Sequence, residues 1–161
     1  MIELVNFLDT SYEKQFSTLA WRNSKQVADY FQIKYIDEET HRNWLEKLQP
    51  PDFEVIAFFI RVDGVDVGVT YFHSIDHEMK QADWGMYIHD KNMRGKGIGQ
   101  QALSQCLGYA HDEMRMHKIF LEVIEGNHAA IRLYEKLGFA LLGQKDDVIR
   151  MEKALTPATR S

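Results

Sequence analysis

The amino-acid sequence predicts a mixed α/β fold in which helices flank a sheet. Two kinds of apolar spacing alternate along its 161 residues: short β-branched and aromatic runs typical of strands, and longer stretches with the helical period. Their order is strand, two helices, a three-stranded meander, helix, strand, helix and two strands. A hydrophobic content of 45% is enough for one core, so we expect a single domain over residues 1–155 and a frayed tail over 156–161.

The N-terminal part predicts one strand and two helices. Residues 1–7 place apolar side chains adjacent or two apart, which favours a strand. A helical stripe follows over residues 12–31, although the polar residues 22–24 interrupt it and indicate a bend or a loop. Asp37 opens a second helix whose first turn is acidic, as the helix dipole favours, and Pro50-Pro51 ends it.

The middle of the chain predicts an antiparallel meander. Residues 53–62 and 65–72 are rich in β-branched and aromatic residues. Asp63-Gly64 stands between them, and this dipeptide favours the tight turn of a hairpin. We expect a third strand over residues 82–89.

The C-terminal half alternates helix and strand. Residues 97–115 carry a helical apolar stripe, and residues 118–124 form a strand. Asn127 is a good N-cap for a helix over 128–137, and Gly138 stands where a left-handed residue ends such a helix. The last two strands are expected over 139–142 and 148–151.

Composition excludes several classes of function. The balance of 19 basic and 24 acidic residues gives a net charge of −5, which argues against binding nucleic acid or an anionic membrane surface. One cysteine, Cys106, forms no internal disulfide, and on a helical apolar stripe it is expected to be a buried, unreactive thiol. Without a membrane-length apolar run or a signal-peptide pattern, we expect a soluble, cytoplasmic protein. The seven histidines lack metal-ligand spacing, so no metal is expected.

A glycine-rich turn at residues 94–99 opens the helix over 97–115. Glycines allow a ligand to approach the backbone closely, the first N–H groups of a helix point outward, and the helix dipole favours negative charge. The turn therefore predicts a site for a phosphate or pyrophosphate. Residues 97–102 also match the dinucleotide pattern G-x-G-x-x-G/A, but too little chain remains for two βαβαβ halves. Lys96 is not placed as in a Walker P-loop.

Two motifs together resemble the GNAT superfamily of N-acetyltransferases: Arg94-x-x-Gly97-x-Gly99, and the segment 127–139 one helix and one strand later. The resemblance implies a central, mostly antiparallel twisted sheet, and acetyl-CoA whose pyrophosphate meets the backbone amides of the turn. It also implies that the pantetheine arm follows a splayed strand near residues 86–89, with a backbone N–H near Ile88 for the acetyl carbonyl. One departure is the segment 90–93, which lacks a proline often found there. The cofactor-binding residues expected on this basis are Ile88, His89, Arg94, Gly95, Lys96, Gly97, Ile98, Gly99 and Asn127.

Glu122 is the candidate general base. It interrupts the apolar strand over 118–124, where a carboxylate is costly unless it faces a cleft or a partner, and partial burial would raise its pKa. The strand Leu121-Glu122-Val123 resembles the one that supplies the base in ribosomal-protein acetyltransferases. The alternative is a buried structural carboxylate, and His73, His89 and Asp83 are rival bases, acting directly or through water.

Tyr134 is the candidate general acid. It follows Asn127 by seven residues, about two helical turns, so both side chains project from one helix face. By resemblance, Tyr134 protonates the coenzyme A thiolate, and Asn127 binds the pantetheine besides capping the helix. The alternatives are a core tyrosine with a satisfied hydroxyl and an asparagine that only caps.

The segment Trp21-Arg22-Asn23 bears on the identity of the amine acceptor, because it resembles a motif in two GNAT branches. One branch acetylates protein N-termini of the ribosomal type, and the other acetylates the 4-amino group of a UDP-linked 4-amino-4,6-dideoxy sugar in pseudaminic acid synthesis. The pattern is closer to the amino-sugar branch, so Arg22 is expected to hold a phosphate or sugar oxygen. The expected substrate-binding residues are Trp21, Arg22, Trp44, Tyr71 and His73. Alternatively, Trp21 and Trp44 belong to the core and Arg22 forms a surface ion pair.

The leading hypothesis is therefore direct acetyl transfer from acetyl-CoA to a small-molecule amine, preferably on a nucleotide-linked amino sugar. A protein N-terminus or a polyamine is the alternative acceptor, and a non-catalytic acyl-CoA sensing module is the alternative from another class. The open edge of the C-terminal strands could pair with a second copy, which makes a homodimer one expectation.

Overall fold

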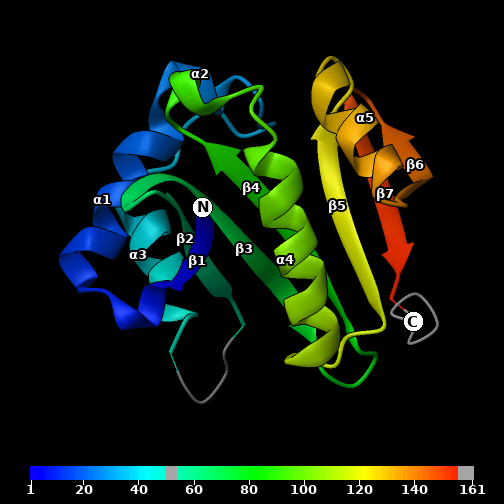
Figure 1. Cartoon of the computed structure of the whole chain (residues 1–161), viewed down its shortest axis with the longest axis horizontal. Helices are drawn as coiled ribbons and strands as arrows, with labels where there is room; N and C mark the ends of the chain where they lie inside the picture. The colour runs from blue at the N-terminus through cyan, green and yellow to red at the C-terminus, as the bar shows by residue number, and fades with distance from the viewer. Residues whose placement is uncertain (50–53, 156–161) are drawn as a thin grey trace.

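Seven strands form one twisted sheet in the computed structural model, which describes residues 1–49 and 54–155 (Figure 1). Their order in the sheet is β1-β2-β3-β4-β5-β7-β6, and every neighbouring pair is antiparallel except β4 and β5. The predicted mixed α/β architecture is confirmed. The strands are β1 (Ile2–Asn6), β2 (Ile56–Val62), β3 (Val65–Asp76), β4 (Gln81–Ile88), β5 (Lys118–Ile124), β6 (Ala140–Lys145) and β7 (Val148–Ala154).

The helices cover both faces of this sheet. One face packs against α4 and α5, around Trp84, Leu103 and Leu121. The other packs against α1 and α3, around Phe7, Leu45 and Phe59. The helices are η1 (Phe7–Asp9), α1 (Tyr12–Asn23), α2 (Lys25–Ala28), α3 (Glu38–Glu46), η2 (Lys91–Met93), α4 (Ile98–Asp112) and α5 (His128–Lys136).

Local sequence signals account for most element boundaries. Asp37 caps α3 by accepting a hydrogen bond from the Thr40 N–H at 2.7 Å, and Asn127 caps α5 through the Ala130 N–H at 3.4 Å. The interruption expected at residues 22–24 is a break: Ser24 has extended backbone angles and separates α1 from α2. Pro50-Pro51 and the tail 156–161 lie outside the described residues.

The strands β4 and β5 separate along their length, which opens the sheet. They pair in parallel only where Gln81–Asp83 meets Lys118–Phe120. Toward their C-terminal ends they diverge in Figure 1, with the start of α5 near the end of β5. Among the described residues, the backbone of β4 from Trp84 onward therefore has no strand partner on that side.

Cys106 lies on the buried stripe of α4, as predicted. Its side chain is fully buried, and its Sγ lies 3.4 Å from the Thr70 hydroxyl oxygen. Burial raises the pKa of the thiol to about 11. It is therefore protonated and enclosed in the folded protein.

No helix within residues 1–49 and 54–155 is long and apolar enough to cross a membrane. Over the same residues, no group of three or more His, Cys, Asp or Glu side chains is arranged to hold a metal ion.

Candidate active site

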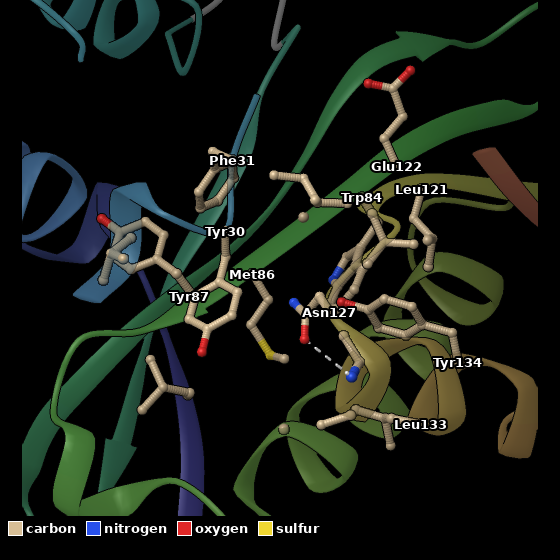
Figure 2. A pocket seen from close by; sticks show the side chains of 18 of the residues that line it. Tyr30, Phe31, Trp84, Met86, Tyr87, Leu121, Glu122, Asn127, Leu133 and Tyr134 are labelled. Carbon is tan, nitrogen blue, oxygen red and sulfur yellow. Dashed lines mark hydrogen bonds between the residues drawn. The ribbon is translucent and has the colours of Figure 1, made fainter. Parts of the chain in front are cut away.

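A cleft of about 670 Å³ occupies the opening between β4 and β5. Its walls come from β4, β5, the turn before α4, one face of α5 and residues 30–33 beyond α2. Figure 2 shows side chains from these separate segments converging on one space. The glycine turn and the candidate catalytic residues of the sequence analysis thus meet in one cleft.

Strand alternation gives this cleft two different sides. Trp84 and Met86 on β4 pack with the α4 and α5 core, as does Leu121 on β5. Tyr87 on β4 packs with the α1 and α3 core. We name these the cofactor side and the acceptor side of the cleft. Because the sheet is open between β4 and β5, a ligand on one side can meet a ligand on the other.

The glycine turn has the geometry expected of an anion site. Gly95 and Gly97 adopt left-handed backbone angles, with φ of 74° and 78°, and Gly97 is the N-cap of α4. The first N–H groups of α4 have no acceptors within the helix, and Gly97, Ile98 and Gly99 line the cleft. These residues fit the pyrophosphate of acetyl-CoA. Lys96 is exposed and lies outside the cleft lining.

Arg94 lines the cleft, but its guanidinium is engaged with backbone carbonyls. It donates hydrogen bonds to the Gln26 carbonyl at 2.7 Å and to the Ile88 carbonyl at 2.8 Å. The charge expected to face a phosphate is thus turned toward α2 and the end of β4.

Asn127 and Tyr134 share one face of α5, and both line the cleft. Figure 2 shows the Tyr134 hydroxyl directed toward Asn127 and Trp84. The ring packs edge-on against Trp84 and Phe139, and the hydroxyl has no hydrogen-bond partner among the described residues. Burial raises the pKa of Tyr134, which keeps the phenol protonated, as a general acid requires.

Glu122 differs from its expected environment. Its side chain is 57% exposed, because β5 alternation turns it to the acceptor side, away from the α5 core. The expected partial burial is therefore wrong, and so is the alternative of a buried structural carboxylate. Arg150, its cross-strand partner on β7, lies 3.6 Å from the carboxylate. Figure 2 shows the carboxylate pointing away from Tyr134.

The three rival bases differ in whether they line the cleft and in whether their polar atoms are already paired. Asp83 forms a two-pronged ion pair with Arg150, at 2.9 and 3.1 Å, so both of its oxygens are engaged. His73 lines the cleft, and burial lowers its pKa, so its imidazole is neutral at neutral pH. His89 does not line the cleft, since its ring stacks on Trp21 at 3.7 Å on the α1 side.

Arg22 is the residue of the predicted acceptor group with the most unusual surroundings. Its guanidinium lies 3.9 Å above the Phe31 ring and donates to the Ile33 carbonyl at 2.7 Å. Its Nη1 is buried without a partner among the described residues, and Arg22 lines the cleft. Burial lowers the pKa of the guanidinium. The alternative of a surface ion pair is wrong.

The other predicted acceptor residues separate into three groups. Tyr71 and His73 line the cleft, and they also border a second cavity of about 390 Å³ that Trp44 lines. The Tyr71 ring crosses β4 at Gly85, where a Cβ would lie 2.6 Å from the ring. Trp21 packs against the α1 and α3 core and lies on neither cavity.

Some cleft residues were not predicted from the sequence. Tyr87 and Phe31 form the acceptor wall, with their rings 6.3 Å apart. Arg150, which is outside the cleft lining, pairs with both nearby carboxylates, Asp83 and Glu122. Alternation along residues 82–89 could have placed Tyr87 on the same side as Asp83. The pairing of Arg150 with Glu122 depends on the register between β5 and β7, which no local pattern encodes.

The comparisons with known proteins agree with this geometry. Residues 8–140 match a family model described as an acetyltransferase (GNAT) domain. The chain is 28% identical over 147 residues to acetyltransferase PseH of Campylobacter jejuni, which covers 91% of this chain and 90% of that protein. It is 29% identical over 87 residues to spermidine N(1)-acetyltransferase of Escherichia coli, covering 54% of this chain and 46% of that protein.

Solved structures show the same fold. The spermidine N-acetyltransferase of Vibrio cholerae, in complex with CoA and spermine, superposes with a TM-score of 0.81 at 20% identity, covering 96% of this chain and 95% of that one. Campylobacter jejuni PseH in complex with acetyl coenzyme A gives a TM-score of 0.72 at 22% identity, covering 97% and 100% of the two chains. With the match of the family model, these findings show that the chain belongs to the GNAT acetyltransferase family and is an acetyl-CoA-dependent N-acetyltransferase.

Proposed function

We propose that the chain acetylates the primary amine of a nucleotide-linked 4-amino-4,6-dideoxy sugar, within one acyl-CoA N-acyltransferase domain over residues 1–155. The observation that carries this choice is the buried, unpartnered Nη1 of Arg22 on the acceptor side. A buried donor without a partner is costly, and a phosphate or sugar oxygen of the acceptor would satisfy it. A polyamine offers only further positive charge there.

The surroundings of Arg22 suit the same class of acceptor. Phe31 and Tyr87 give apolar ring surface beside the guanidinium, and Tyr71 lies near it on the neighbouring strand. A nucleotide-linked sugar carries anionic oxygens at one end and the amine at the other. The relation to acetyltransferase PseH over 91% of the chain supports an amino-sugar acceptor.

In the proposed mechanism, Glu122 and Tyr134 act on opposite sides of the cleft. Acetyl-CoA supplies the thioester carbonyl that the amine attacks. Glu122 takes the proton of the ammonium group, so that a neutral amine forms the new C–N bond. Tyr134 gives its proton to the departing thiolate as the C–S bond breaks, and the second proton lost by the new amide nitrogen returns to the Tyr134 oxygen, directly or through water. Because the Glu122 carboxylate points away from Tyr134, its proton transfer is proposed to run through the acceptor side, directly or through water.

His73 is the second candidate base. It lines the cleft, its imidazole is neutral at neutral pH, and Glu122 and Asp83 are near enough to act on its charge. Glu122→Gln should lower kcat by about 100-fold if the carboxylate is the base. An unchanged kcat in Glu122→Gln, with a large loss in His73→Gln, would assign the base to His73.

A polyamine is the second candidate acceptor. It is favoured by the exposed Glu122 carboxylate and by the fold shared with a spermidine N-acetyltransferase. Arg22 separates the two acceptors, because its loss should impair an anionic acceptor and leave or improve a cationic one.

The test is coenzyme A thiol release from acetyl-CoA with UDP-4-amino sugars, polyamines and short peptides as acceptors. Turnover with the amino sugar that falls in Arg22→Ala would support the proposal. Turnover with spermidine that is insensitive to Arg22→Ala would assign a polyamine, and turnover with a peptide would assign a protein N-terminus. Saturable acetyl-CoA binding without turnover on any amine would favour the sensing module.

The homodimer remains a prediction. The edge strand β6 has all six residues exposed, including Leu141 at 67%, so its backbone edge is open to a second copy. Sedimentation velocity of the wild type beside Leu141→Lys tests it, since the lysine should remove a dimer that forms through this edge.

A further inference from the structure

Arg94 joins the cofactor turn to the acceptor wall, which lie far apart in sequence. Its Nη2 donates to the Gln26 carbonyl at 2.7 Å and to the Ile88 carbonyl at 2.8 Å, and its Nε lies 3.3 Å from the same Ile88 oxygen. Its guanidinium also lies 5.4 Å from the centre of the Tyr30 ring. A planar guanidinium with donors in a fixed fork is well suited to hold two carbonyls at once.

Hydrogen bonds run in both directions between Gln26 on α2 and the segment 88–94. The side-chain amide of Gln26 donates to the His89 carbonyl at 2.9 Å. Gln26 thus accepts from Arg94 through its backbone and donates to His89 through its side chain. Just before it in the chain, Trp21 stacks on the His89 ring at 3.7 Å with the planes 7° apart. Together these contacts fasten α2 to the segment 88–94.

Both fastened segments belong to the cleft. Beyond α2, Tyr30 and Phe31 line its acceptor side, and Gly95 and Gly97 line its cofactor side immediately after Arg94. Residues 29–36 form no regular helix or strand, and their backbone is joined to α2 only by the last hydrogen bonds of that helix. The position of this segment therefore depends on side-chain contacts. Arg94 is therefore placed where a change at the phosphate turn reaches the acceptor wall.

We propose that Arg94 is a positioning residue that couples acetyl-CoA binding to the ordering of the acceptor wall, rather than a phosphate ligand. When phosphates fix the turn at residues 95–99, Arg94 is held with its fork on Gln26 and Ile88, and α2 and Tyr30 are held in turn. The acceptor then meets a preformed wall. This inference does not depend on which amine is the acceptor.

Hydrogen–deuterium exchange with coenzyme A as the only ligand tests the coupling. In the wild type, saturating coenzyme A should slow amide exchange over residues 22–33 as well as at the turn. In Arg94→Ala, the slowing should persist at the turn and be lost over residues 22–33. If coenzyme A leaves exchange over residues 22–33 unchanged in the wild type, there is no coupling and the proposal is wrong.

Lys96→Ala is the matched control, since it removes one positive charge from the same turn. We expect Lys96→Ala to weaken coenzyme A binding several-fold and to keep the slowing over residues 22–33 at saturation. The proposal is overturned if Arg94→Ala weakens coenzyme A binding as much as Lys96→Ala and keeps that slowing, because Arg94 would then act as a phosphate cation.

Two milder variants keep the test decisive if Arg94→Ala folds poorly. Arg94→Lys keeps the charge but lacks the fork, so it should bind coenzyme A like the wild type and lose the slowing over residues 22–33. Gln26→Met removes the hydrogen bond to His89 and leaves the turn unchanged. This variant should lose part of the slowing of amide exchange over residues 22–33. Full retention of the slowing in both variants would contradict the coupling role.

Discussion

The two sides of the cleft present different kinds of chemical group to a ligand. The cofactor side offers backbone N–H groups from one short stretch, residues 94–99, together with Asn127 and Tyr134 from one helix. The acceptor side offers side chains from α1, β3, β4 and β5, which come together only in the folded sheet. A backbone site needs a local conformation, whereas a side-chain site needs a particular set of residues. The acceptor side is therefore where members of one family can differ in specificity without losing the cofactor.

The largest effect is expected at Tyr134, on the cofactor side. Tyr134→Phe should lower kcat by about 100-fold or more, since the thiolate loses its proton donor, and should leave both KM values nearly unchanged. Tyr109→Phe, which removes a hydroxyl from a half-buried ring on α4, is the control for a general loss of packing. A kcat equal to that of the control would make Tyr134 a core aromatic with no part in proton transfer.

The next effect should be confined to the acceptor side. Arg22→Ala should lower kcat/KM for an anionic amino-sugar acceptor by about 10- to 100-fold, as expected for a charge-assisted hydrogen bond worth about 1.5–3 kcal/mol. The KM for acetyl-CoA should stay constant in the same steady-state experiment. Arg42→Ala, on the exposed face of α3, removes the same charge at a site away from the cleft. Equal losses in the two variants would show that only overall charge matters.

A smaller effect should be confined to the cofactor side. Gly97→Ala places a side chain where φ is 78°, a conformation that costs an L-residue about 1–2 kcal/mol. The turn should relax and have to re-form on binding, so the KM for acetyl-CoA should rise by about 5- to 10-fold at unchanged acceptor KM. Gly108→Ala lies inside α4, where a Cβ meets no atom within 4 Å, and should show no such rise. Because saturating acetyl-CoA fixes the turn, a rise in the acceptor KM at saturating acetyl-CoA would show that the substitution disturbs more than the cofactor side.

The smallest expected effect is a pH dependence of stability that comes from His41 on α3, one of the helices on the acceptor side of the sheet. Burial lowers the pKa of His41 in the folded protein, so the unfolded chain binds this proton more readily. This contribution to stability is complete above the unfolded pKa of about 6.5 and declines as the pH falls below it. His41→Gln should flatten the fall in the free energy of unfolding between pH 7.5 and 5.5, measured with urea. The exposed His77→Gln is the control, and an identical slope in both variants would assign the dependence to other groups.

The same contrast explains what could be predicted from the sequence. The turn at residues 94–99 and the pair Asn127 and Tyr134 are defined by local spacing. The structure places them in the cleft, except for Lys96, which lies outside its lining. Glu122 was expected to be partly buried and is exposed, because the side to which β5 turns it depends on how the sheet packs. Trp21 and His89 were expected at the site, yet they stack on each other beside it. Their positions follow from the packing of α1 on the sheet, a long-range contact that no short motif encodes.

The burial of Cys106 has a practical consequence for measuring this enzyme. It is the single cysteine of the chain, it is fully buried, and its pKa of about 11 keeps it protonated. A chromogenic disulfide reagent added to the native protein should therefore titrate only the coenzyme A released by turnover, with no stoichiometric background from the catalyst. The same reagent becomes a probe of conformational opening when substrate is left out, because the thiol reacts only in molecules whose core has come apart.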